Sequence, residues 1–133
     1  DISSTDTPLE AGLGFALDWS KAFRGRESLL AQRESGVRKR LASFVLANPE
    51  GTLWGNEPIY RDDALVGYTT SAAYGPTLRA AVALGYVSRS DGDIVTDAFV
   101  SSGRYEIENA GRRMPARVSL KAPYDPARTR VLC

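Results

Sequence analysis

Histidine is absent from this 133-residue chain, and cysteine occurs once, at Cys133. Without histidine the chain has no imidazole general base, no Ser–His or Cys–His pair, and none of the commonest zinc ligand. A single cysteine forms neither an internal disulfide nor a cysteine cluster. We therefore expect neither a catalytic residue nor a metal site in this chain.

The sequence also lacks a strong excess of charge and a long apolar run. Its 17 basic and 16 acidic residues give a formal net charge of +1, so no global field attracts nucleic acid or an anionic membrane. No apolar run is long enough to span a bilayer. We expect a soluble, cytoplasmic protein with neither a nucleic-acid nor a membrane partner. The chain starts at Asp1 rather than at methionine, which predicts that it was processed or cut from a longer protein.

The first 36 residues combine an irregular start with one helix. A short strand is expected over residues 15–19. Good helix formers over residues 26–34 predict a helix, and Gly36 stands where a glycine would end it. Gly12-Leu13-Gly14 opens like a dinucleotide fingerprint, but Leu17 takes the third glycine position and no βαβ unit follows. We predict no dinucleotide site here.

From Val37 onward the pattern is that of β-strands. Residues 37–46 alternate at first and end fully apolar, which predicts a strand that starts at an exposed edge and runs into a core. On such a strand Arg38-Lys39-Arg40 is an exposed edge rather than a basic binding patch. Strands at 58–61 and 65–70 flank Asp62-Asp63-Ala64, which predicts a hairpin with a solvated turn rather than a metal site.

The remaining segments complete an all-β pattern. Further strands are expected at 80–87, 104–108 and 114–120, with a short helical turn at 96–100. Short strands at regular spacing are typical of a closed or sandwich-like β domain. Basic residues outnumber acidic ones near the C-terminus and form either a solvated surface or a site for a polyanionic ligand tail. They are Arg104, Arg112, Arg113, Arg117, Lys121, Arg128 and Arg130.

Several segments, taken in order, resemble one protein family. The segments are 7–15, 21–30, 53–60, 67–71, 76–78 and 83–87. They are similar to the C-terminal part of the glycine cleavage T-protein (aminomethyltransferase) family. Segments 104–108 and 122–126 resemble the branch of flavin-dependent dimethylglycine and sarcosine dehydrogenases, which carry a T-protein-like module behind an oxidase module. Arg24, Ala72, Ala73 and Pro76 depart from the family pattern.

The resemblance implies a fold. It predicts a mainly β chain with one short N-terminal helix and an antiparallel, jelly-roll-like β-barrel. Residues 1–36 would be the end of a preceding folate-binding domain, as a strand plus a helix. Residues 37–133 would form the C-terminal barrel.

The resemblance also implies a function. The chain would be the C-terminal part of a tetrahydrofolate-dependent one-carbon transfer enzyme and would not be catalytic alone. The parent would demethylate a small amine with FAD held in a module absent here, and the missing N-terminal domains would be its partners. Glu10 would bind the pterin ring, because a carboxylate accepts two N–H bonds from an aminopyrimidine edge.

Other interpretations of the chain stay open. Without the resemblance, Glu10 is a residue that caps or solvates a turn. A stand-alone β-barrel binding module without chemistry is the alternative function. An RNA-modifying relative is disfavoured by the balanced charge.

Overall fold

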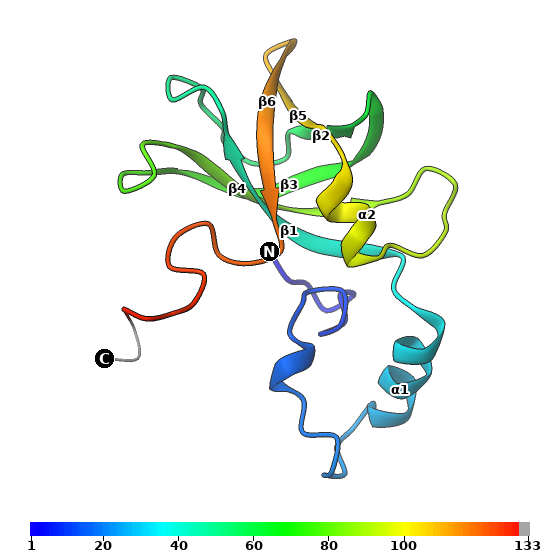
Figure 1. The fold of residues 1–133 in the computed structure, drawn as a ribbon. Coiled ribbons are helices and arrows are strands. Elements are labelled where there is room, and N and C mark those ends of the chain that lie inside the picture. Colours follow the sequence, from blue (N-terminus) through cyan, green and yellow to red (C-terminus); the bar gives the residue numbers. More distant parts are fainter. Residues whose placement is uncertain (131–133) are drawn as a thin grey trace.

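The computed structural model describes residues 1–130, so Cys133 lies outside the described part. Six antiparallel strands close into a barrel in the order β1-β4-β3-β2-β5-β6 (Figure 1). The strands are β1 (Lys39–Leu46), β2 (Pro58–Arg61), β3 (Ala64–Gly75), β4 (Ala80–Ser88), β5 (Tyr105–Asn109) and β6 (Arg112–Ser119). A 3-10 helix, η1 (Gly14–Ala16), and two α-helices, α1 (Arg26–Ser35) and α2 (Asp97–Ser102), complete the fold. The predicted mainly β architecture with an antiparallel barrel is confirmed.

Both predicted hairpins form, and their turns explain why. Asp62 and Asp63 adopt φ of 48° and 68° between β2 and β3, and Ala110 and Gly111 adopt 50° and 74° between β5 and β6. Two successive residues with positive φ give the turn whose twist matches that of the flanking strands. The acidic pair is therefore a turn, as predicted.

The exposed edge predicted for the start of β1 is wrong for Lys39 and Arg40. β1 pairs with β4 over residues 39–45 and with β6 over residues 43–46, so the barrel leaves it no free edge along its second half. Beside its first half lies the N-terminal segment, where the Leu41 N–H donates to the Glu10 carbonyl at 2.9 Å. The side chains of Lys39 and Arg40 are accordingly 33% and 16% exposed.

The core fills the barrel with side chains from all six strands and from α2. The rings of Phe44 and Tyr105 lie 5.5 Å apart at its centre, packed with Ile59 and Ile107. Val100 of α2 is fully buried against this cluster, so α2 belongs to the core although it has only six residues. The Thr96 hydroxyl caps α2 by accepting from the Phe99 N–H at 3.1 Å.

The strand expected over residues 15–19 does not form. Residues 14–16 instead make η1, because the N–H groups of Ala16 and Leu17 donate locally to the carbonyls of Leu13 and Gly14. The predicted helix does form as α1, and Gly36 ends it with φ of 83°. The assignment of residues 1–36 to a preceding domain stays a prediction.

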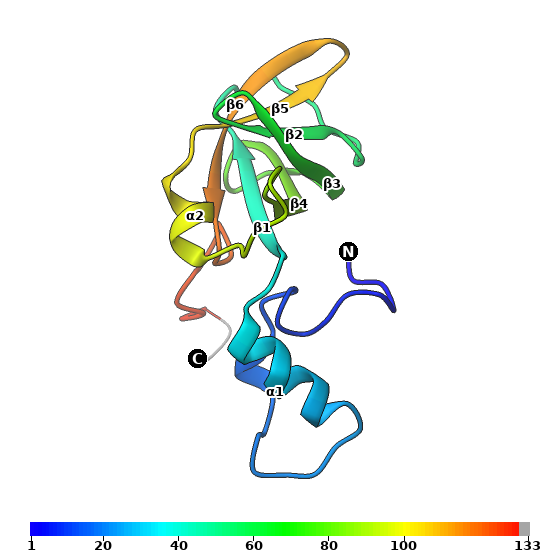
Figure 2. The ribbon, with the colours of Figure 1, turned by 90° about the vertical axis from the view of Figure 1, so that its right-hand side faces the viewer.

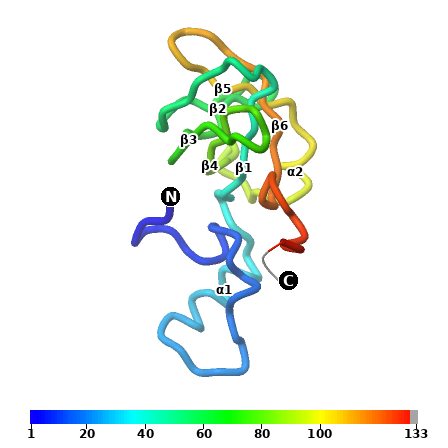
Figure 3. The backbone as a smooth tube through the Cα atoms, turned by 90° about the vertical axis from the view of Figure 1, so that its left-hand side faces the viewer, coloured from blue at the N-terminus to red at the C-terminus, as the bar shows by residue number. Residues whose placement is uncertain are grey.

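Helix α1 and the loop before it extend away from the barrel in every view (Figures 1, 2 and 3). None of its ten residues is buried. A helix of this length has little stability of its own without tertiary packing.

We therefore expect the amides of α1 to exchange with deuterium much faster than those of β1 and β4. The protected strand amides should open only with global unfolding, whereas α1 should open by local fraying. Hydrogen exchange followed by NMR measures both in one sample. Equal protection in α1 and β4 would contradict this expectation.

Candidate functional site

The N-terminal segment lies against one end of the barrel, beside the start of β1 (Figure 2). Three polar contacts attach it. The Glu10 carbonyl accepts from the Leu41 N–H, Lys39 pairs with Asp6, and the Thr70 hydroxyl donates to Asp1 at 2.8 Å. These contacts bring Glu10, the residue predicted to bind the pterin, next to β1, β3 and β4.

Glu10 lines a hollow of about 460 Å³ together with Lys39, Tyr68 and Tyr86, and we call it the Glu10 hollow. The remaining lining residues are Arg38, Gly67, Thr70 and Ser88. Tyr68 is 49% exposed, so one aromatic wall is open to solvent. The hollow therefore combines a carboxylate, an ammonium group, a guanidinium group and two phenol rings.

The Glu10 carboxylate also has a local structural role. Its Oε2 accepts from the Thr7 N–H at 2.9 Å, while the Thr7 hydroxyl accepts from the Glu10 N–H at 3.2 Å. This reciprocal pair has the pattern of a capping box. Oε1 accepts a long bond of 3.5 Å from the Gln32 amide. The turn thus fixes one carboxylate oxygen and leaves the other weakly engaged.

Three titratable groups beside Glu10 influence one another. The hydrogen bond from Lys39 is the main cause that lowers the pKa of Asp6 to about 2, and the same bond raises the pKa of Lys39. Burial, helped by the Asp6 charge, raises the pKa of Tyr86. The Tyr86 hydroxyl is buried without a hydrogen-bond partner in residues 1–130. At neutral pH this cluster presents an ion pair and a neutral phenol.

A planar heterocycle that carries N–H groups suits this chemistry. The exposed Tyr68 ring can stack against it, and the weakly engaged Glu10 oxygen can accept its N–H groups. Within residues 1–130 no group of three or more Asp, Glu, His or Cys side chains is placed to hold a metal ion. Among the described residues, the Glu10 hollow therefore offers a carboxylate and aromatic surface rather than a set of metal ligands.

The other charged residues singled out in the sequence do not form a second site of this kind. Asp63 pairs with Arg104 at 3.5 Å and with Arg113 at 3.1 Å, and its side chain is 70% exposed. Arg113 also stacks 3.6 Å above the Tyr60 ring. Arg128 lies 5.8 Å from the Phe15 ring, on the N-terminal segment. Arg104 and Arg113 share Asp63 whereas Arg128 lies beside Phe15, so these arginines do not converge on one anion site.

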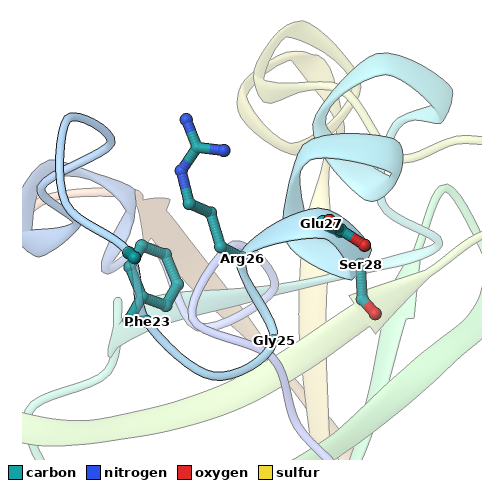
Figure 4. A pocket seen from close by; sticks show the side chains of 6 residues that line it. Phe23, Gly25, Arg26, Glu27 and Ser28 are labelled. Atoms are coloured by element: carbon teal, nitrogen blue, oxygen red, sulfur yellow. The ribbon is translucent and has the colours of Figure 1, made fainter.

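A hollow at the start of α1 is also excluded as a candidate binding site. Ala22, Phe23, Gly25, Arg26, Glu27 and Ser28 line it, and Figure 4 shows the Phe23 and Arg26 side chains apart from those of Glu27 and Ser28. Arg26 is engaged locally, because its guanidinium donates to the Trp19 carbonyl at 2.9 and 3.1 Å.

Sequence reasoning missed Lys39 and Tyr86 as neighbours of Glu10. Their proximity follows from the register of β1 and β4, in which Leu41 lies opposite Tyr86 and Lys39 opposite Ser88. Residues two apart on a strand share a face, so Lys39 and Tyr86 are diagonal neighbours. The alternation within each strand was visible in the sequence, but the register between them was not.

Comparisons with known proteins decide the family. The profile of the glycine cleavage T-protein C-terminal barrel domain matches residues 39–125. The chain belongs to this family. A solved structure of the glycine cleavage system aminomethyltransferase T from Bartonella henselae shares the fold, with a TM-score of 0.73 at 22% identity over 89% of this chain and 32% of that one.

Two mouse proteins are similar over almost the whole chain. The mitochondrial pyruvate dehydrogenase phosphatase regulatory subunit is 42% identical over 90% of this chain. Mitochondrial sarcosine dehydrogenase is 39% identical over 98% of it. The chain spans only 15% and 14% of the lengths of these two relatives. The described residues contain no helix that is both long and apolar enough to cross a membrane.

Proposed function

We propose that this chain serves as the C-terminal region of a tetrahydrofolate-dependent one-carbon transfer enzyme of the aminomethyltransferase type. The parent would be an amine-demethylating dehydrogenase, with FAD and the small amine held by domains that precede this region. The observation that carries the proposal is the family match over residues 39–125, joined to similarity with sarcosine dehydrogenase over 98% of the chain.

The Glu10 hollow would receive the pterin end of the folate. Lys39 pairs with Asp6 beside it, and the Arg38 guanidinium donates to the Gly92 carbonyl, so the Glu10 carboxylate is the anionic acceptor in the lining for N–H donors of the ligand. The preceding domains would supply the other walls and exclude water from the reactive carbon unit. Because those walls are absent from this chain, preorganisation is lost and the chain alone should bind folate weakly.

A second candidate function is a binding module without chemistry. One mouse relative favours this candidate, because it is 42% identical to the chain and is named as a regulatory subunit rather than as an enzyme. Both mouse relatives are named as mitochondrial proteins, which supports mitochondria as an alternative to the predicted cytoplasmic location.

The test is folate affinity in the complete polypeptide that contains this region. Glu10→Gln keeps the shape of the side chain but turns one acceptor oxygen into a donor. Loss of a hydrogen bond to a charged group costs enough binding free energy that folate affinity should fall by about tenfold to a hundredfold. The rate of amine oxidation should stay nearly constant, because that step belongs to another module.

Glu50→Gln is the matched control, since Glu50 is exposed and does not line the Glu10 hollow. It should leave folate affinity unchanged. Equal affinity in the unaltered protein and in Glu10→Gln would return Glu10 to its capping role alone. A complete polypeptide that binds no reduced folate at all would favour the binding module.

A further inference from the structure

A second hollow, of about 580 Å³, lies where residues 9–15, α1 and the loop before α2 meet. It shares no lining residue with the Glu10 hollow. Apolar side chains of Leu9, Phe15, Val37 and Ile94 line it, and Arg40 lies among them. We propose that this Arg40 hollow binds a small carboxylate with an apolar body, anchored by the Arg40 guanidinium.

Arg40 has unused hydrogen-bonding capacity in a largely buried place. Its side chain is 16% exposed, and Nε makes a long bond of 3.4 Å to Asp97 Oδ1. The two terminal nitrogens have no acceptor in the described part of the chain. A guanidinium carries five N–H donors in a planar fork that fits a carboxylate with two parallel bonds. The guanidinium therefore has N–H donors beyond the Asp97 bond from which a ligand carboxylate can accept.

The Arg40 guanidinium lies against the backbone of Gly12. A Cβ on Gly12 would overlap Arg40 Nη1, so a larger residue there would displace the end of this flexible side chain from the Gly12 backbone. Gly12 also has φ of 76°, which favours glycine for a separate reason. The Gly12 contact and the Asp97 bond thus place the guanidinium at the wall of the hollow.

Gln32 adds a second polar requirement. It lines the same hollow from α1, and its Oε1 is buried without a partner in residues 1–130. A buried acceptor without a donor costs free energy, which a ligand N–H would recover. Two cations, Arg33 and Arg40, face one carboxylate, Asp97, so the charge of the hollow favours an anion.

These features together define the ligand class. A carboxylate would pair with Arg40, a neighbouring N–H would donate to Gln32, and a ring or hydrocarbon would pack on Leu9, Phe15 and Ile94. An N-acylated apolar amino acid has all three parts. A hollow of this volume is in the range of small-molecule sites.

The experiment titrates the 133-residue chain with N-acetylphenylalanine and with its uncharged amide, followed by NMR at the amides of Gly12 and Val95. The acid should bind in about the millimolar range or tighter, and the amide about tenfold more weakly or worse. Arg40→Gln should lose the preference for the acid. Arg104→Gln, which removes a 68% exposed guanidinium elsewhere, should not.

Asp97→Asn is the sharper test, because it should change the affinity for the acid in the opposite direction from Arg40→Gln. Asp97 competes for the Arg40 guanidinium, so its removal should tighten binding of the acid by about two- to fivefold. A merely structural pair would not produce a gain. If Arg40→Gln fails to fold, the comparison of the acid with its amide and the Asp97→Asn variant still test the proposal. Equal binding of acid and amide, absence of shifts at Gly12 and Val95, or weaker binding in Asp97→Asn would overturn the proposal.

Discussion

Replacing Phe44 with alanine should destabilise the chain by about 3–5 kcal/mol, the largest effect of any single substitution considered. Phe44 is fully buried on β1, and its ring lies 5.5 Å from that of Tyr105 at the centre of the barrel. Removal of the ring loses its transfer free energy and leaves a cavity that strands paired on both sides cannot close. A loss of this size is a large fraction of the total stability of a small domain.

The measurement is urea unfolding of Phe44→Ala beside Phe15→Ala. Phe15 is 77% exposed on η1, so the same chemical change should alter the free energy of unfolding by less than about 0.5 kcal/mol. A similar loss for both variants would show that the barrel interior is not the source of stability.

Replacing Glu57 with glutamine should cost about 2–3 kcal/mol, because several hydrogen bonds converge on this carboxylate. Glu57 is only 6% exposed. It accepts from the N–H groups of Trp54 and Gly55 and from the Thr69 hydroxyl on β3. A glutamine amide would turn N–H groups toward these donors. The loop that carries Trp54, itself 80% exposed, would lose the group that fixes it.

The pH dependence of this loss has a definite sign. Burial raises the pKa of Glu57, but the hydrogen bonds from Thr69, Trp54 and Gly55 outweigh it and leave the pKa below its usual value. The carboxylate therefore contributes stability above the ordinary glutamate pKa and loses it as pH falls through the folded-state pKa. The difference in unfolding free energy between the unaltered chain and Glu57→Gln should shrink toward acid pH. A difference that stays constant with pH would contradict this account.

Local sequence signals were enough for most of the fold. Alternation gave the strands, Asp62 and Asp63 gave one turn, and Gly36 gave the end of α1, because each of these features depends on residues close in sequence. The strand expected around Phe15 also rested on local pattern alone, and this prediction was wrong. There the N–H groups of Ala16 and Leu17 donate to carbonyls three residues back, which makes a 3-10 helix instead of a strand.

The candidate site could be predicted only in part. Glu10 was chosen by resemblance, but its neighbours Lys39 and Tyr86 depend on the β1–β4 register. Arg40 was interpreted as an edge residue because nothing local shows that Gly12 packs against it. Contacts between residues far apart in sequence follow from tertiary structure rather than from pattern or propensity.

The central claim is that this barrel, with the N-terminal segment in place, offers the Glu10 hollow to the pterin of a reduced folate. The most direct measurement is the set of intermolecular NOEs between a stable reduced folate and the tyrosine rings of the 133-residue chain. The account predicts NOEs from the pterin to Tyr68 and Tyr86, which line the hollow, and none to Tyr74, which is 58% exposed outside it. NOEs to Tyr74 as strong as those to Tyr68 and Tyr86, or none to any ring at saturating folate, would contradict it.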